Sequence, residues 1–419
     1  MLMKKLFSRI ASNSLARDSA IVFAGSMAAN IGSYIYHLLM GRLLGPAGYG
    51  ELSSLFSLLY IFTVPLVVGQ TVLVKFISGF KAHGEVGQAK SLFLSVTKLC
   101  IVICIIGLPL VLLCSPLVTS FLHLSSTALL TLIYLLFAFS LLTVATASMI
   151  QGYQKFFWFS IFSAGAIIIK VILSIPFVQW GVLGVLVAAT IASVIMYLLY
   201  FLPLRFVLTS KSKPTNLTKR EAVTFAVPTL LTLLGTTSIY STDIILVRHY
   251  FAANEAGFYA ALAILGKIIF YASSSVALVL FPVLSEQTAK GAASKKLITS
   301  AIGAVAIVSL GLALLYFLFP DMIVSLLFGN AYRGAGVLLG LFGSFIALYS
   351  VGYIISTICL ALGKTGIWIV PASCALIQIV AITIFHGSIS TVIVLNIAVS
   401  VLLVVGTLGY YLARAYEKI

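Results

Sequence analysis

The chain has 419 residues, of which 62% are hydrophobic and 8% are charged, and its formal net charge is +16. Soluble domains carry about 25% charged residues, so this composition excludes a soluble globular domain and predicts a protein that crosses the membrane many times. The positive charge would suit a nucleic-acid partner, but the sequence has no P-loop, zinc-finger or basic-helix motif, so no nucleic-acid binding is expected.

Residues 1–18 form a basic segment that precedes the first long apolar run. Leu2, Leu6, Phe7 and Ile10 fall near one helical face, which predicts an interfacial segment on the cytoplasmic side. A secretory signal peptide is the competing interpretation. We do not expect one, because the apolar run that follows is too long and no small-residue cleavage site ends it.

The apolar runs predict an all-α polytopic membrane protein, because a transmembrane helix needs about 20 mostly apolar residues. Twelve spans are expected, at residues 19–41, 51–74, 91–114, 127–149, 158–178, 182–204, 222–247, 257–280, 298–319, 335–361, 366–385 and 390–412. The longest connection is a basic linker at 205–221. It divides the chain into an N-terminal lobe at 19–204 and a C-terminal lobe at 222–413, which is followed by a cytoplasmic tail at 414–419.

The connection between the first two spans, Gly41 to Glu51, contains glycines and a proline that end one helix before the next begins. Residues 47–49 (Ala-Gly-Tyr) have a counterpart 209 residues later at 256–258 (Ala-Gly-Phe), and the same distance separates Lys155 from Lys364. We interpret these matches as a duplicated half of six spans. Small-residue turns also recur in membrane proteins without duplication, which is the alternative.

The positions of the cations predict the orientation. Nineteen of the 25 Lys and Arg residues fall in the N-terminus, every second loop and the C-terminus, whereas the opposite side has only Arg42, Arg248 and Arg333. Since cation-rich short loops stay cytoplasmic, both termini are expected in the cytoplasm. With six spans in each half, the halves would be parallel repeats, which place a binding cavity at their interface.

Four charged side chains lie inside predicted spans, where a charge costs about 2.5–3.5 kcal/mol and normally faces a cavity or a partner. Lys267 lies near the middle of its span on a face of small and polar residues, and we favour a cavity role for it. For Lys170 a structural pair and a cavity role are equally open. Lys98 can extend its amine back to the interface. For Asp243, ion coupling and a structural pairing with Arg248 are both open.

Two spans that would be repeat partners carry polar stripes. The stripe members, each on one helical face, are Ser26, Asn30, Tyr34 and His37 in the first span and Thr232, Thr236, Tyr240 and Asp243 in the seventh. Two halves that line one wet cavity would carry such stripes. Arg42 lies at the outer membrane surface, where a lipid-phosphate contact is the alternative to substrate binding.

Neither a metal site nor a catalytic site is expected, and no cofactor. The five cysteines lie in or beside apolar runs without metal-ligand spacing. A membrane glycosyltransferase would need catalytic groups, usually on a substantial outer loop. The outer loops here are short, and their acidic residues Glu51, Glu255 and Asp321 are widely separated.

Several motifs in chain order resemble the polysaccharide biosynthesis (O-antigen flippase) family of the multidrug/oligosaccharidyl-lipid/polysaccharide (MOP) exporter superfamily. They are Arg-Asp-Ser-Ala at 17–20, Gly-Arg-Leu-Leu-Gly-Pro-Ala-Gly-Tyr-Gly at 41–50, Gln-Gly-Tyr-Gln-Lys at 151–155, Asp-Ile-Ile-Leu at 243–246, Gly-Phe-Tyr-Ala-Ala at 257–261 and Phe-Pro-Val-Leu-Ser-Glu at 281–286. The resemblance implies two six-helix lobes, alternating access and a cationic central cavity lined by spans 1, 2, 7 and 8.

The resemblance also implies a substrate and its surroundings. A polyprenyl-diphosphate-linked oligosaccharide would be flipped from the cytoplasmic to the outer leaflet of the cell (inner) membrane, among membrane lipids and with a proton or sodium as coupling ion. Lys267 would pair with the diphosphate and Asp243 would bind the coupling ion. The remaining substrate-binding candidates are Asn30, Tyr34, Tyr240, Lys170 and Arg42. A multidrug cation antiporter of the same superfamily and a flippase for a lipid-linked peptidoglycan precursor are the alternatives.

Overall fold

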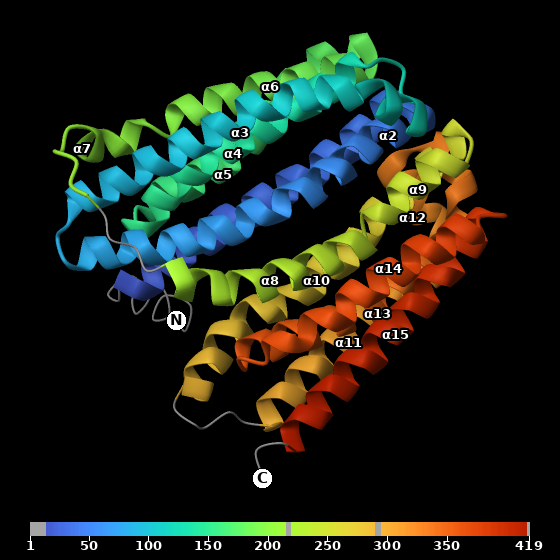
Figure 1. Ribbon diagram of the computed structural model, residues 1–419. Coiled ribbons are helices and arrows are strands. Elements are labelled where there is room, and N and C mark those ends of the chain that lie inside the picture. The colour runs from blue at the N-terminus through green and yellow to red at the C-terminus, as the bar shows by residue number, and fades with distance from the viewer. Residues whose placement is uncertain (1–13, 215–218, 290–294, 417–419) are drawn as a thin grey trace, which may run out of the picture. The chain divides into compact units, whose positions relative to one another are not determined.

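The protein is built from α-helices (Figure 1). The computed structural model describes residues 14–214, 219–289 and 295–416, and this part of the chain contains no β-strand, which confirms the all-α class. Most of the predicted N-terminal segment 1–18, part of the predicted linker and the last three residues of the tail lie outside the described residues.

The helices follow the chain in a simple order. The first half contains α2 (Ser14–Ala82), α3 (Val86–Phe121), α4 (Ala128–Gly152), α5 (Phe156–Phe177), η1 (Val178–Trp180), α6 (Gly181–Leu199), η2 (Leu202–Leu204) and α7 (Arg205–Leu208). The second half contains α8 (Lys219–Ile239), α9 (Thr242–Tyr250), α10 (Ala253–Ala289), α11 (Lys295–Leu318), α12 (Pro320–Phe328), η3 (Asn330–Ala335), α13 (Gly336–Ala361), η4 (Thr365–Trp368), α14 (Ile369–Ile384) and α15 (Ile389–Tyr416).

The described chain contains ten helical segments that are long and apolar enough to cross a membrane. Two of them, Ile21–Ala82 and Phe156–Leu208, are 62 and 53 residues long, and each covers two predicted spans. Gly45 breaks the first with φ 68° and ψ 178°, a backbone conformation that glycine adopts without a Cβ clash. The turn of η1 and Gly181, with φ 63°, break the second. The ten segments therefore account for the twelve predicted spans.

The chain divides into two compact units. The first unit holds the chain up to Met40 together with Pro65–Ser120 and Leu124–Lys219, and the second holds Gly41–Val64, Phe121–His123 and the chain from Arg220 onward. The main border lies within the region predicted as a linker. The hairpin at 41–64 packs in the second unit, although the sequence assigned it to the N-terminal lobe.

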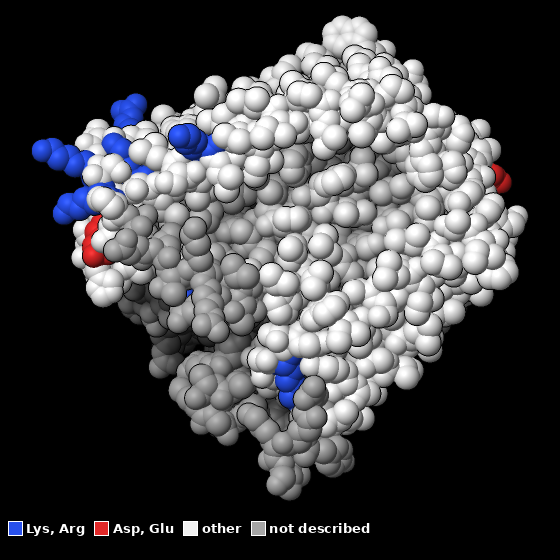
Figure 2. All heavy atoms as spheres, viewed as in Figure 1, with Lys and Arg blue, Asp and Glu red and all other residues white. Residues whose placement is uncertain are grey.

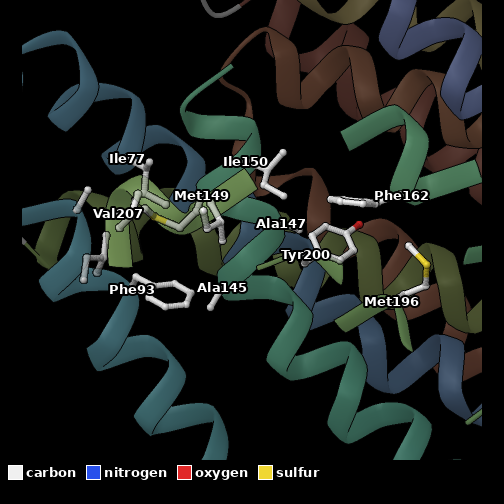
Figure 3. Close-up of a cluster of buried hydrophobic side chains, with 13 residues drawn as sticks. Ile77, Phe93, Ala145, Ala147, Met149, Ile150, Phe162, Met196, Tyr200 and Val207 are labelled. Atoms are coloured by element: carbon white, nitrogen blue, oxygen red, sulfur yellow. The ribbon is translucent and has the colours of Figure 1, made fainter. Parts of the chain in front are cut away.

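Each unit has its own apolar core. In the first unit, side chains of α2 to α6 meet around Ile77, Met149 and Phe162 (Figure 3). The rings of Phe162 and Tyr200 are 4.7 Å apart between centroids, which is a typical aromatic contact. In the second unit, α13 lies at the centre and packs against α10, α11 and α15, with Phe342, Phe345 and Tyr349 almost fully buried.

The outer surfaces are apolar, as hydrocarbon contact requires. On α3 most of the exposed side chains are aliphatic, and Leu113 is 78% exposed. The charged residues gather instead at the ends of the helices, and Figure 2 shows Lys and Arg clustered at the end of the first unit that carries α7. There Lys90 donates hydrogen bonds to the carbonyls of Leu208 and Ser210.

The two turns that the sequence pairs by their spacing lie against each other in the second unit. An added Cβ at Gly50 would stand 2.8 Å from the backbone nitrogen of Gly257, and one at Gly257 would stand 1.9 Å from the carbonyl oxygen of Pro46. Backbones can approach this closely only where side chains are absent. The contact explains why glycines occupy these turns, and the duplication of the halves stays a prediction.

Candidate functional site: a buried lysine and a buried carboxylate in the second unit

The predicted seventh span is a broken helix. The apolar segment Ala226–Tyr250 is divided into α8 and α9 by residues 240 and 241, and Ser241 has φ −129°. Non-helical backbone at membrane depth is tolerated only where protein buries it or water reaches it. The break frees the carbonyl of Ile239, which accepts a hydrogen bond of 2.8 Å from Gln378 Nε2 of α14. The polar stripe predicted for this span assumes one continuous helix, so the sequence did not predict this break.

The break brings Asp243 into the first turn of α9. The positive end of a helix favours a carboxylate there. Asp243 is 1% exposed, and its Oδ1 accepts a hydrogen bond of 2.8 Å from the backbone N–H of Ile244. Its Oδ2 accepts a 2.5 Å bond from the hydroxyl of Tyr259 and a longer bond, 3.4 Å, from Asn396 Nδ2. Three donors thus converge on one carboxylate, which can only accept.

These bonds continue as a directed chain that links four helices. Gln378 Nε2 of α14 donates to Asn396 Oδ1 of α15 at 2.8 Å, and Asn396 Nδ2 donates to the Tyr259 hydroxyl of α10 at 2.7 Å. Tyr259 in turn donates to Asp243. Hydrogen bonds that point the same way polarise one another and strengthen. Within the described residues, Gln378 Oε1 and the Ser241 and Ser400 hydroxyl oxygens are buried without a hydrogen-bond partner.

Lys267 lies on the same helix as Tyr259. The glycine before it allows α10 to approach α13 closely, because a Cβ at Gly266 would stand 2.7 Å from side-chain atoms of Phe342 and Ile346. Lys267 is 8% exposed, and no described residue accepts a hydrogen bond from its Nζ. A buried ammonium without such a bond loses hydration that no hydrogen bond replaces.

Two tyrosine rings and one carboxylate offset part of that loss. Lys267 Nζ lies 4.6 Å from the centroid of the Tyr60 ring and 5.7 Å from that of Tyr240. Such cation–π contacts contribute about 0.5–2 kcal/mol. Asp243 attracts Lys267 electrostatically, but the described side chains form no ion pair within 4.0 Å at this site. The ammonium therefore keeps all three of its donors available.

The predicted residues fall into two groups. Lys267, Tyr240 and Asp243 lie together in the second unit, whereas Asn30, Tyr34 and Lys170 lie in the first. Lys170 Nζ stands 3.8 Å from the centroid of the Tyr36 ring, so each unit has an intramembrane lysine over a tyrosine. Asn30 is exposed and Tyr34 is half-buried. Their roles in binding stay predictions.

Arg42 and Arg248 have local partners. Arg42 Nε donates to the carbonyl of Leu327 at 2.9 Å and Nη2 donates to that of Leu326, so Arg42 caps the C-terminal turn of α12. Arg248 donates to the carbonyls of Leu122 and His123 at 3.0 and 2.8 Å. The alternative in which Arg248 pairs with Asp243 is therefore wrong, and a role for Arg42 in substrate binding stays a prediction.

Sequence reasoning did not select Tyr259, Gln378, Asn396 or Tyr60 as site residues. Gln378 and Asn396 are amides in otherwise apolar spans, so a search for buried amides would have found them. Tyr259 and Tyr60 carry no such signal, because tyrosine is common in this chain. The described residues contain no group of three or more His, Cys, Asp or Glu side chains that could hold a metal ion.

Two helical units with ten segments that are long and apolar enough to cross a membrane define the class as a multi-pass α-helical membrane protein, and solved structures share this fold. The chain is similar to lipid II flippase MurJ in an inward closed conformation, with 15% identity, TM-score 0.71 and coverage of 94% of this chain and 87% of that one. It is also similar to an inward-facing multidrug resistance MATE family transporter of the MOP superfamily, with 15% identity, TM-score 0.67 and coverage of 91% and 94%. A MOP superfamily transporter from Pyrococcus furiosus matches with 16% identity, TM-score 0.65 and coverage of 96% and 97%.

The family follows from the sequence match. The model of the family described as polysaccharide biosynthesis protein matches residues 15–288, and the chain belongs to this family. No curated protein matches the chain. The match includes Asp243, Tyr259 and Lys267 but ends before Gln378 and Asn396.

Proposed function

We propose that the protein flips a polyprenyl-diphosphate-linked oligosaccharide from the cytoplasmic to the outer leaflet of the cell membrane by alternating access. The observation that carries the proposal is Lys267, a buried cation whose ammonium has no hydrogen-bond acceptor among the described residues. A diphosphate has several strong acceptor oxygens and would supply what this ammonium lacks. The family and the MurJ-like fold support the same substrate class.

The physical task suits such a site. A sugar-diphosphate headgroup cannot cross hydrocarbon unaided, because its charges and hydroxyls would lose their hydration. Its lipid tail can stay in the bilayer throughout. Lys267 would pair with the charge while Tyr240 would contact the sugars. Lys170, Asn30 and Tyr34 of the first unit stay candidates for substrate binding. The protein would thus act as a transporter and not as an enzyme.

Asp243 is our candidate for the coupling ion. It is a buried carboxylate beside a helix break, and broken helices bind ions and substrates in many transporters. Burial disfavours the charge of Asp243 while its three donors stabilise the carboxylate, so a change in these surroundings would shift its protonation. Sodium would need oxygen ligands, and Gln378 Oε1 and the hydroxyl oxygens of Ser241 and Ser400 are buried without a hydrogen-bond partner among the described residues. Transport driven by a proton gradient and by a sodium gradient in proteoliposomes would separate the two.

A multidrug cation antiporter is the second candidate, supported by the fold of MATE family transporters. Lys267 opposes it, since a cationic drug would meet a positive charge at the tyrosine rings. A peptidoglycan-precursor flippase shares the chemistry of our proposal, because its substrate also joins sugars to a lipid diphosphate.

The test is an analysis of lipids in cells that lack the gene. We expect a polyprenyl-diphosphate-linked glycan to accumulate in the cytoplasmic leaflet, as measured by mass spectrometry and a leaflet-accessibility assay. Wild-type protein should reverse this and Lys267→Met should not. Lys98→Met is the matched control, because Lys98 is an exposed lysine on α3, and it should restore flipping. Normal glycan pools together with altered sensitivity to cationic compounds would support the antiporter instead.

A further inference from the structure

Tyrosines gather around Lys267 in the second unit. Tyr60 of α2, Tyr240 before α9, Tyr271 of α10, and Tyr349 and Tyr353 of α13 form this group, which we call the tyrosine cluster. Phe270 joins its members, with ring centroids 5.8 Å from Tyr240, 5.5 Å from Tyr349 and 5.0 Å from Tyr353. The cluster comes from four separate parts of the chain.

The depth of the cluster in the membrane is unusual for tyrosine. Tyrosines of membrane proteins concentrate at the two interfaces, where the hydroxyl reaches water. Lys267 lies near the middle of its predicted span, and Tyr271 follows one helical turn later. Lipid-facing positions at this depth would carry Leu, Ile or Val, as most exposed positions of α3 do. Hydroxyl-bearing rings here indicate contact with a polar ligand.

Tyr271 is the member most open to such a ligand. It is 46% exposed, whereas Tyr349 is fully buried and donates a 3.1 Å hydrogen bond to the carbonyl of Thr236. No described residue makes a hydrogen bond with the Tyr271 hydroxyl. Tyr349 therefore supports the cluster from behind, and Tyr271 presents a ring face and a hydroxyl.

We propose that the tyrosine cluster is a sugar-stacking subsite, in which the Tyr271 ring carries a hexose whose neighbouring anionic group lies at Lys267. This inference rests on the proposed function and names the part of the substrate that each side chain would hold. The C–H face of a hexose is electropositive and apolar, and it matches the negative face of an aromatic ring. The anion is either the diphosphate next to the first sugar or the carboxylate of an acidic sugar.

The arrangement disfavours the other common ligand of aromatic clusters. Clustered tyrosine rings bind organic cations through their negative faces. Here the ammonium of Lys267 already lies over Tyr60 and Tyr240, so a second cation would be repelled. A ligand with both a sugar ring and a negative charge satisfies the rings and the lysine together.

The experiment compares probes that differ in one feature, on purified full-length protein in nanodiscs. The probes are farnesyl diphosphate, farnesyl-diphosphate-linked N-acetylglucosamine, methyl glucuronide and methyl glucoside. Tyr271→Leu should weaken binding of farnesyl-diphosphate-linked N-acetylglucosamine by about 3- to 10-fold, as loss of one aromatic contact predicts, and leave farnesyl diphosphate unchanged. Tyr271→Phe keeps the ring and should stay within about twofold of wild type on the sugar-bearing probe.

Controls separate this inference from the proposed function. Tyr250→Leu removes a ring that stacks on His386 elsewhere in the unit, and it should leave the affinity for every probe unchanged. If the anion at Lys267 is the diphosphate, Lys267→Met should weaken binding of both diphosphate probes. If it is a sugar carboxylate, Lys267→Met should weaken binding of methyl glucuronide but not of methyl glucoside. Tyr271→Leu could weaken binding of farnesyl diphosphate and of its sugar-bearing form equally, or change neither affinity. Either result would overturn the stacking subsite and leave the proposed flippase function unaffected. Failure of wild-type protein to bind any probe would overturn both.

Discussion

Tyr259→Phe tests the hydrogen-bonded chain around Asp243. The substitution removes one hydroxyl, which donates to Asp243 at 2.5 Å and accepts from Asn396 at 2.7 Å, and it keeps the buried ring. A hydrogen bond to a charged group contributes about 1.5–3 kcal/mol, and a neutral bond about 1 kcal/mol. Asn396 Nδ2 would keep only its 3.4 Å contact with Asp243. We therefore expect a loss of about 2.5–4 kcal/mol of unfolding free energy.

The measurement is equilibrium unfolding in mixed micelles, where this loss corresponds to about a 60- to 800-fold change in the unfolding constant. Tyr316→Phe is the matched control. Tyr316 is a buried tyrosine of the same unit whose hydroxyl donates one 2.7 Å bond to the carbonyl of Leu265, so its removal should cost about 1 kcal/mol.

A double-mutant cycle isolates the role of the charge. In an Asp243→Asn background the acceptor is neutral, so Tyr259→Phe should cost only about 2 kcal/mol, about 1 kcal/mol for each of the two neutral bonds that it removes. An equal cost in both backgrounds, or a cost no larger than that of Tyr316→Phe, would refute the charge-assisted chain.

The remaining predictions concern charge, packing and capping. Lys267→Met should abolish flipping and yet raise the unfolding free energy by about 1–2 kcal/mol, because it removes a buried ammonium without a hydrogen bond; a destabilised but active variant would contradict this. Gly257→Ala should cost about 1–3 kcal/mol, since its Cβ would meet the Pro46 carbonyl. Gly303→Ala on α11 has open space and should stabilise by about 0.5–1 kcal/mol in the same unfolding assay. Arg42 caps the last carbonyls of α12, so Arg42→Met should accelerate amide hydrogen exchange in the segment after α12. Unchanged exchange would exclude this capping role.

Much of the site could be predicted from residue type and position. Lys267 and Asp243 are site candidates from the sequence because a charge inside an apolar span normally faces a cavity or a partner. The structure places both in one buried site of the second unit. The partners of Asp243 could not be predicted this way. Tyr259, Asn396 and Gln378 lie on three different helices, at sequence distances of 16, 153 and 135 residues, and only packing brings them together.

The sequence by itself determined the all-α membrane class, twelve spans and the family, because apolar run length and glycine-rich turns are local properties of the chain. The tertiary structure decided where span 7 breaks, and it assigned the hairpin at 41–64 to the second unit. The break depends on a carbonyl that Gln378 satisfies from another helix, and the hairpin on contact between the backbones at Gly50 and Gly257. Such contacts between distant segments leave no periodic signal, so they emerge only when the helices are packed.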